Sequence, residues 1–101
     1  YSLDSKRRIQ KLIKQKRYSV ALQTIHFELW KNPDNGAVKF EKLKLLAQIH
    51  QLNNFFKSLE KDYTKEGRLI TCQQIHLEPT FRELWKRQQF INQFQKICSR
   101  I

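Results

Sequence analysis

The residues of this chain that could do chemistry are three histidines, two cysteines and a scattered set of carboxylates. His26, His50 and His76 each follow an isoleucine. No two of them have the His-x-x-x-His spacing that would place both imidazoles on one helix face around a metal ion. No Cys-x-x-Cys motif adds sulfur ligands, so structural or surface histidines are the favoured interpretation. We therefore expect no metal site and no cofactor.

Cys72 and Cys98 are the candidate nucleophiles. Either thiol could pair with a histidine, and the two could form a disulfide, but buried reduced thiols are commoner in a basic helical domain. The nine Asp and Glu residues are scattered among lysines, and two glycines are too few for a phosphate-binding loop or a nucleophile elbow. The sequence predicts that the protein is not an enzyme. It also predicts an intracellular, reducing compartment, the cytoplasm or the nucleus.

Positive charge is the strongest feature of the composition. Twenty Lys and Arg residues oppose nine Asp and Glu residues, which gives a formal net charge of +11. Such a balance favours an acidic protein, a nucleic acid or an anionic membrane as partner, although basic side chains also keep helix surfaces soluble. The densest cluster lies near the N-terminus. The candidate basic face comprises Lys6, Arg7, Arg8, Lys11, Lys14, Lys39, Lys42 and Lys44.

Trp30 and Trp85 are candidate aromatic anchors. Each is followed by a lysine and lies at the edge of a predicted apolar stripe. An aromatic side chain in such a place can anchor a partner protein or stack on a base. The alternative, a tryptophan at the periphery of the core, is slightly favoured.

Helices are expected to position these residues. In residues 12–35, apolar and small side chains follow helical spacing and end at Asn32-Pro33, which predicts a helix, a turn and a second helix over 18–31. A first helix should begin near Ser5, a third should span 37–50, and a fourth should begin at 52 and end at Gly67. Residues 68–78 are interpreted as a short helix, with a strand as the alternative. A long helix should cover 80–99.

The helix over 18–31 is apolar on two sides, because Val20, Phe27 and Trp30 lie off its main stripe. Two apolar faces imply neighbouring helices on both sides, as in stacked hairpins or a bundle. The alternative is that the second face waits for a partner protein. Because more helices follow in the chain, we favour the first interpretation.

The spacing resembles that of tetratricopeptide repeats, a family of 34-residue helix–turn–helix units. Residues that match the second-helix and closing positions of two successive units are Tyr18, Ala21, Ile25 and Pro33, and then Leu52, Phe55, Leu59 and Gly67. The match covers residues 2–68, about two repeats. Related hairpin repeats of RNA metabolism, or a helix bundle without repeats, would also fit this pattern.

Together these observations predict one all-α domain over residues 1–101, part of a longer protein, with five or six helices stacked as antiparallel hairpins and a longer C-terminal capping helix. No stretch of the sequence is apolar enough for a membrane span. The resemblance implies a non-enzymatic scaffold for protein–protein interaction, and the basic surface implies an acidic protein or peptide partner. The alternative is an RNA- or DNA-binding domain that contacts phosphates through the same faces.

Overall fold

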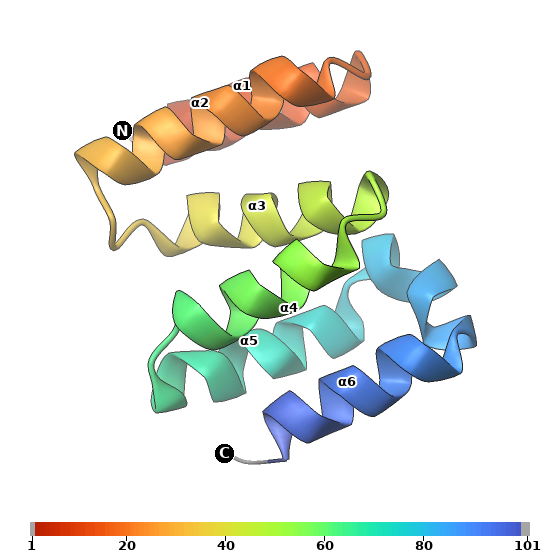
Figure 1. Ribbon diagram of the computed structural model, residues 1–101. Coiled ribbons are helices and arrows are strands. Elements are labelled where there is room, and N and C mark those ends of the chain that lie inside the picture. The colour runs from red at the N-terminus through yellow and green to blue at the C-terminus, as the bar shows by residue number, and fades with distance from the viewer. Residues whose placement is uncertain (1, 100–101) are drawn as a thin grey trace. The chain divides into compact units, whose positions relative to one another are not determined.

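The structure is a computed structural model that describes the backbone of residues 2–99 and the side chains of residues 6–99. Every regular element in this described part is helical, which confirms the all-α class (Figure 1). The elements in chain order are α1 (Ser2–Lys14), α2 (Tyr18–Lys31), α3 (Gly36–Gln48), α4 (Leu52–Lys61), α5 (Lys65–Leu77), the 3₁₀ helix η1 (Pro79–Lys86) and α6 (Gln88–Cys98). No described helix has the length and apolarity needed to cross a bilayer.

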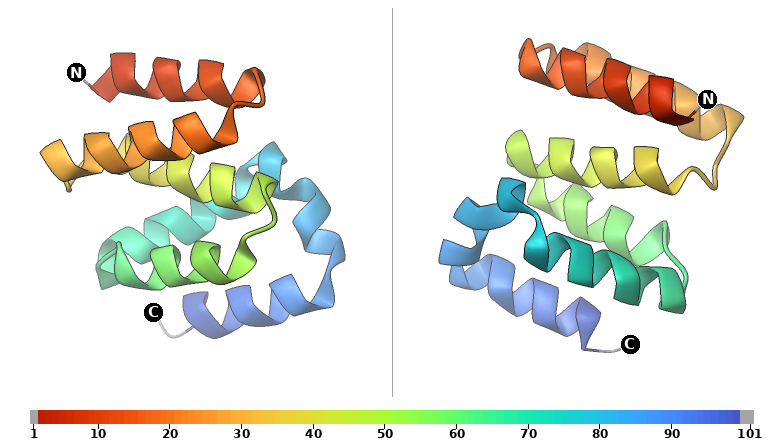
Figure 2. Two further views of the ribbon diagram at one scale, coloured as in Figure 1. Left: turned by 45° about the horizontal axis from the view of Figure 1, so that its top comes forward. Right: turned by 180° about the vertical axis from the view of Figure 1, so that it is seen from behind.

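The chain divides into two compact units, Tyr1–Leu45 and Leu46–Ile101, and α3 extends from the first into the second. In the first unit α1 packs along α2, and the two helices run in opposite directions (Figures 1 and 2). Ile9 of α1 and Ala21 and Ile25 of α2 are fully buried. These three residues are the apolar positions that the helical spacing places on the inner faces.

Local backbone geometry repeats after 34 residues. Helices α1 and α3 each contain 13 residues and begin 34 residues apart. Lys16 and His50, in the turns that follow them, both have a φ of 60°. Arg17 and Gln51 come next and share nearly the same backbone angles, φ −92° and ψ 66° against φ −93° and ψ 66°.

The first of these turns shows why the chain stops α1 at this point. The N–H of Lys16 donates to the carbonyl of Ile13 at 2.9 Å, and that of Arg17 donates to Leu12 at 2.9 Å. This pair of bonds defines the Schellman motif, which satisfies the last carbonyls of a helix and needs a left-handed residue. Glycine is the usual residue at this position, because only glycine enters the left-handed region without steric cost. In this chain the position is occupied by Lys16, whose φ is 60°.

Two helix starts are set by side-chain caps. The Asn35 side chain accepts from the N–H of Val38 at 3.3 Å at the start of α3, and Thr64 accepts from Gly67 at 3.4 Å at the start of α5. The prediction that Gly67 ends the fourth helix is therefore wrong, because the Thr64 cap makes Gly67 part of the first turn of α5. Residues 68–77 are helical, and α1 begins at Ser2 rather than near Ser5.

The predicted long C-terminal helix is also wrong. The chain forms the 3₁₀ helix η1, passes through Arg87 in an extended conformation (φ −97°, ψ 118°) and then forms α6. Nine residues of a straight α-helix turn through about 900°, which would place Phe81 and Phe90 on opposite sides. Both rings are buried here and both contact Phe55, with centroids 5.6 and 5.7 Å away. The break at Arg87 lets two aromatic residues enter one core.

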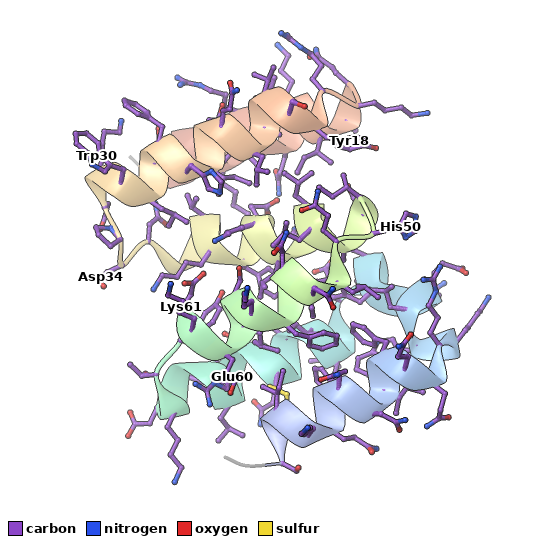
Figure 3. All side chains as sticks on the ribbon, in the orientation of Figure 1. Tyr18, Trp30, Asp34, His50, Glu60 and Lys61 are labelled. Atoms are coloured by element: carbon purple, nitrogen blue, oxygen red, sulfur yellow. A yellow bond between two sulfur atoms is a disulfide. The ribbon has the colours of Figure 1, made fainter. Side chains whose placement is uncertain are left out.

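Cys72 of α5 and Cys98 of α6 form a disulfide, visible as the yellow bond in Figure 3. The expectation of reduced thiols is wrong because α6 packs against α5 and brings the two Cα atoms to 6.3 Å, within bonding range. A disulfide does not fit the reducing compartment that the composition favoured.

Candidate binding surface

Helix α1 presents most of the predicted basic face to solvent. Arg7, Arg8, Lys11 and Lys14 are exposed, and Lys6 is half-buried. An α-helix turns by about 100° per residue. Arg7, Lys11 and Lys14 therefore lie between about 140° and 200° around the helix from buried Ile9, on its opposite side. The inner position of Ile9 thus forces this cationic stripe outward.

One carboxylate, Asp4, precedes this surface in the sequence, and none follows it before Glu28. Between positions 6 and 27 the chain contains seven Lys and Arg residues and no Asp or Glu. Lys16 and Arg17, in the turn after α1, are exposed and extend the cluster to the end of the helix. Like charges at this density favour an anionic ligand, since binding one would relieve their mutual repulsion.

The three predicted lysines of α3 are in a different position. Lys39, Lys42 and Lys44 are half-buried. The Lys44 ammonium lies 2.8 Å from a carboxylate oxygen of Glu41 and 5.5 Å from the centre of the Phe40 ring. Lys44 is therefore engaged within the first unit rather than offered to a partner.

Glu41 is the residue of this region that the sequence analysis left unassigned. Its side chain is buried, and besides Lys44 it accepts a hydrogen bond from Nε2 of Gln10 at 3.1 Å. The bond joins α1 to α3 within the first unit. A signal was present, because Glu41 lies between the buried residues Val38 and Leu45 and precedes Lys44 by three positions.

Trp30 is one of the most exposed apolar side chains of the first unit, at 78%. Figure 3 shows it at the end of α2 opposite Tyr18. Its ring stacks on Phe27, with centroids 6.3 Å apart and an interplanar angle of 20°. Lys31 lies 4.7 Å from the centre of the Phe27 ring and 3.5 Å from a Glu28 oxygen.

The second apolar face of α2 is therefore not covered by another helix of the first unit. Val20 and Phe27 are 37% and 55% exposed, and with Trp30 they form what we call the α2 stripe. Within the first unit, the neighbours expected on both sides of α2 are found only on the side that buries Ala21 and Ile25. The alternative, a face open to a partner, agrees with their exposure.

Trp85 is a packing residue in the second unit. It is half-buried, and its ring lies edge-on to Phe90 at 5.0 Å, Phe94 at 4.8 Å and His76 at 5.4 Å. Edge-to-face aromatic pairs at these distances are stabilising contacts. The two candidate anchors are thus in different environments, and Trp30 is the one available to a ligand.

The histidines do not gather. His26, His50 and His76 are exposed on α2, in the turn after α3 and on α5. Among the residues with described side chains, no group of three His, Cys, Asp or Glu is arranged to hold a metal ion.

A cavity of about 280 Å³ lies between α4 and α6 in the second unit. Its lining residues are Leu52, Asn53, Phe56, Gln89, Phe90 and Gln93. The lining combines apolar and aromatic side chains with amides and contains no nucleophile or titratable group. Such a lining offers no acid–base chemistry.

Tyr63 is a partly buried titratable group just after the end of α4. Burial raises the pKa of Tyr63 to about 12. Its neighbour Arg68 donates to the backbone carbonyls of Glu60 at 2.6 Å and Tyr63 at 3.2 Å. These contacts close the α4–α5 turn, which makes Tyr63 a structural rather than a reactive group.

Comparisons of this chain with family models, with curated proteins and with solved structures found no match.

Proposed function

We propose that the protein is a non-enzymatic helical scaffold that binds an acidic protein or peptide through the exposed cations of α1. The observation that carries this proposal is the exposed stripe of Arg7, Lys11 and Lys14, within a stretch that contains no carboxylate. Catalysis has no comparable support, since the histidines are dispersed and both cysteines are in a disulfide.

A tetratricopeptide-like architecture remains part of this proposal. It is supported by the 34-residue recurrence of helix lengths and turn angles between α1–α2 and α3–α4. Repeat scaffolds present successive helices as a binding surface, and α1 would be the first of these.

The test is a fluorescence-anisotropy titration with a labelled Asp/Glu-rich peptide at about 0.15 M salt, without reductant. We expect the triple charge reversal of Arg7, Lys11 and Lys14 to Glu to weaken binding at least about tenfold. The matched control reverses three exposed lysines of the second unit, Lys57, Lys65 and Lys96, with the same change in net charge. If both triple variants lost the same amount of affinity for the peptide, the peptide would be attracted by net charge alone, and the proposal would be overturned.

A second candidate function is binding of single-stranded nucleic acid, favoured by the exposed cations of α1 together with Trp30, whose side chain is 78% exposed. The same titration with a labelled single-stranded RNA, and with a duplex DNA of equal length, separates the two functions. Submicromolar RNA binding at physiological salt, with a steep salt slope and competition against the peptide, would promote nucleic acid over protein as the ligand.

A further inference from the structure

The α2 stripe, Val20, Phe27 and Trp30, is the feature that the basic surface of α1 does not explain. We propose that it is the docking site for an acidic amphipathic helix, whose apolar side packs on the stripe and whose carboxylates are attracted by the excess positive charge of the first unit. This inference rests on the proposed function and names the kind of acidic partner.

The spacing of the stripe suits a helix rather than a point contact. Its residues lie at i, i+7 and i+10 on α2, so they follow one side of the helix over about 15 Å, roughly three turns. Single exposed apolar residues are ordinary on protein surfaces. A row of them that ends in a stacked aromatic pair is a surface that binding would bury.

Charge selects the acidic character of the partner. The unit that carries the stripe holds eleven Lys and Arg residues against four Asp and Glu residues. Carboxylates that flank an apolar contact on α2 would be attracted by this excess of positive charge. At the stripe itself, Lys31 adds a cation beside Phe27.

The same observations disfavour other occupants. Lys31 already lies over the Phe27 ring, which reduces the free ring surface on which a base could stack. A second copy of the chain would bring two strongly cationic first units together. An anionic membrane would tolerate the charge, and it is therefore included as an arm of the test.

The experiment compares two labelled peptides of about 18 residues and identical composition. One has leucines at helical spacing and glutamates on the flanks, and the other has the same residues in scrambled order, so that its charge is equal but its apolar face is lost. Binding of each is measured by anisotropy to the unaltered 101-residue chain and to the Phe27→Ala and Trp30→Ala variants. Leu77→Ala on α5 is the matched control, because Leu77 is 79% exposed and lies in the second unit.

We expect the amphipathic peptide to bind at least about tenfold tighter than the scrambled one. Phe27→Ala and Trp30→Ala should remove most of that difference, whereas Leu77→Ala should leave it unchanged. In a Trp85→Phe variant, Trp30 is the sole tryptophan. Its emission should then shift to shorter wavelength with the amphipathic peptide and not with the scrambled one.

Failure of this inference can be distinguished from failure of the proposed function. If both peptides bind equally and the stripe variants change neither, the α1 cations bind acidic ligands and the docking inference is overturned. If neither peptide binds, the proposed function is overturned and the inference with it. Binding to anionic phosphatidylglycerol vesicles with a Trp30 shift, and no preference between peptides, would overturn the inference in favour of a membrane surface.

Discussion

Glu41 and Lys44 form an ion pair that is largely removed from solvent in the first unit. Their side chains are 2% and 16% exposed, and Gln10 adds a hydrogen bond to the Glu41 carboxylate. Charges withdrawn from water to this extent are tolerated because each is paired. The pair thus fixes how α3 meets α1 within the first unit.

Replacing Glu41 with Ala should lower the free energy of unfolding by about 3 kcal/mol, because it leaves a cavity and an uncompensated Lys44. Urea unfolding followed by far-UV circular dichroism measures the loss. Glu83→Ala is the matched control: its ion pair with Lys86 has the same spacing in sequence but lies in solvent, so no change is expected. A loss below about 1 kcal/mol for Glu41→Ala would contradict the role given to this pair.

Tyr63 makes stability depend on alkaline pH. An unfolded tyrosine ionises near pH 10, whereas burial raises the pKa of folded Tyr63 to about 12. Below pH 10 both states are protonated and the contribution is fully present. Between pH 10 and about 12 only the unfolded state loses its proton, so the free energy of unfolding should fall by about 1.4 kcal/mol per pH unit.

The Tyr63→Phe variant should lack this component of the alkaline loss, because phenylalanine has no proton to release. The measurement is the difference in unfolding free energy between the two proteins at several pH values from 9 to about 12. Other titrating groups are common to both proteins and cancel. A difference that stays constant with pH would show that Tyr63 is not protected by burial.

At the scale of elements, the turns after α1 and α3 have the same unfavourable feature, a left-handed residue that is not glycine. Lys16→Gly and His50→Gly should each raise the free energy of unfolding by about 0.5–1 kcal/mol, since glycine adopts φ 60° without strain. Gln15→Gly, one residue earlier and without a positive φ, should destabilise instead. Urea unfolding measures the free energy of unfolding of all three variants. If Lys16→Gly and His50→Gly were both less stable than the unaltered protein, the prediction would be contradicted.

The disulfide links two other elements, α5 and α6, across 26 positions of sequence. In the chain-entropy model, a closed loop of this length adds about 3–4 kcal/mol to stability by restricting the unfolded chain. Reduction should therefore lower the urea midpoint of the unaltered protein. It should not change the urea midpoint of a variant in which both cysteines are replaced by serine. Equal midpoints with and without reductant, after a mass measurement has verified reduction, would exclude this contribution.

At the scale of the whole molecule, charge is unequally shared between the two units. Tyr1–Leu45 holds eleven of the twenty Lys and Arg residues and four of the nine Asp and Glu residues. Repulsion within the first unit should therefore be the larger, and salt should relieve it. Raising salt from about 0.01 to 0.2 M should slow amide hydrogen exchange in α2 more than in α5. A larger effect in α5 would contradict this distribution of repulsion.

Features encoded by nearby residues could be predicted from the sequence. The bounds of α2 follow from its apolar spacing and the Asn32-Pro33 stop, and the all-α class follows from the same periodicity along the chain. The outward cations of α1 follow from the inner position of Ile9. Each of these signals lies within one helix and the turn that ends it, where the backbone alone relates the positions.

The rest was decided by contacts between residues far apart in sequence. No proline or glycine marks Arg87 as a break, and the split between η1 and α6 arises because Phe81 and Phe90 both pack on Phe55. The disulfide likewise depends on α6 lying against α5.

The candidate surface shows the same division. Its cationic character and its tryptophans are properties of the sequence alone. Tertiary packing decided which of them face solvent: it left Trp30 exposed and placed Trp85 among aromatic rings, and it paired Lys44 with a buried Glu41. Side-chain identity is local, whereas exposure depends on which other parts of the chain come to lie against it.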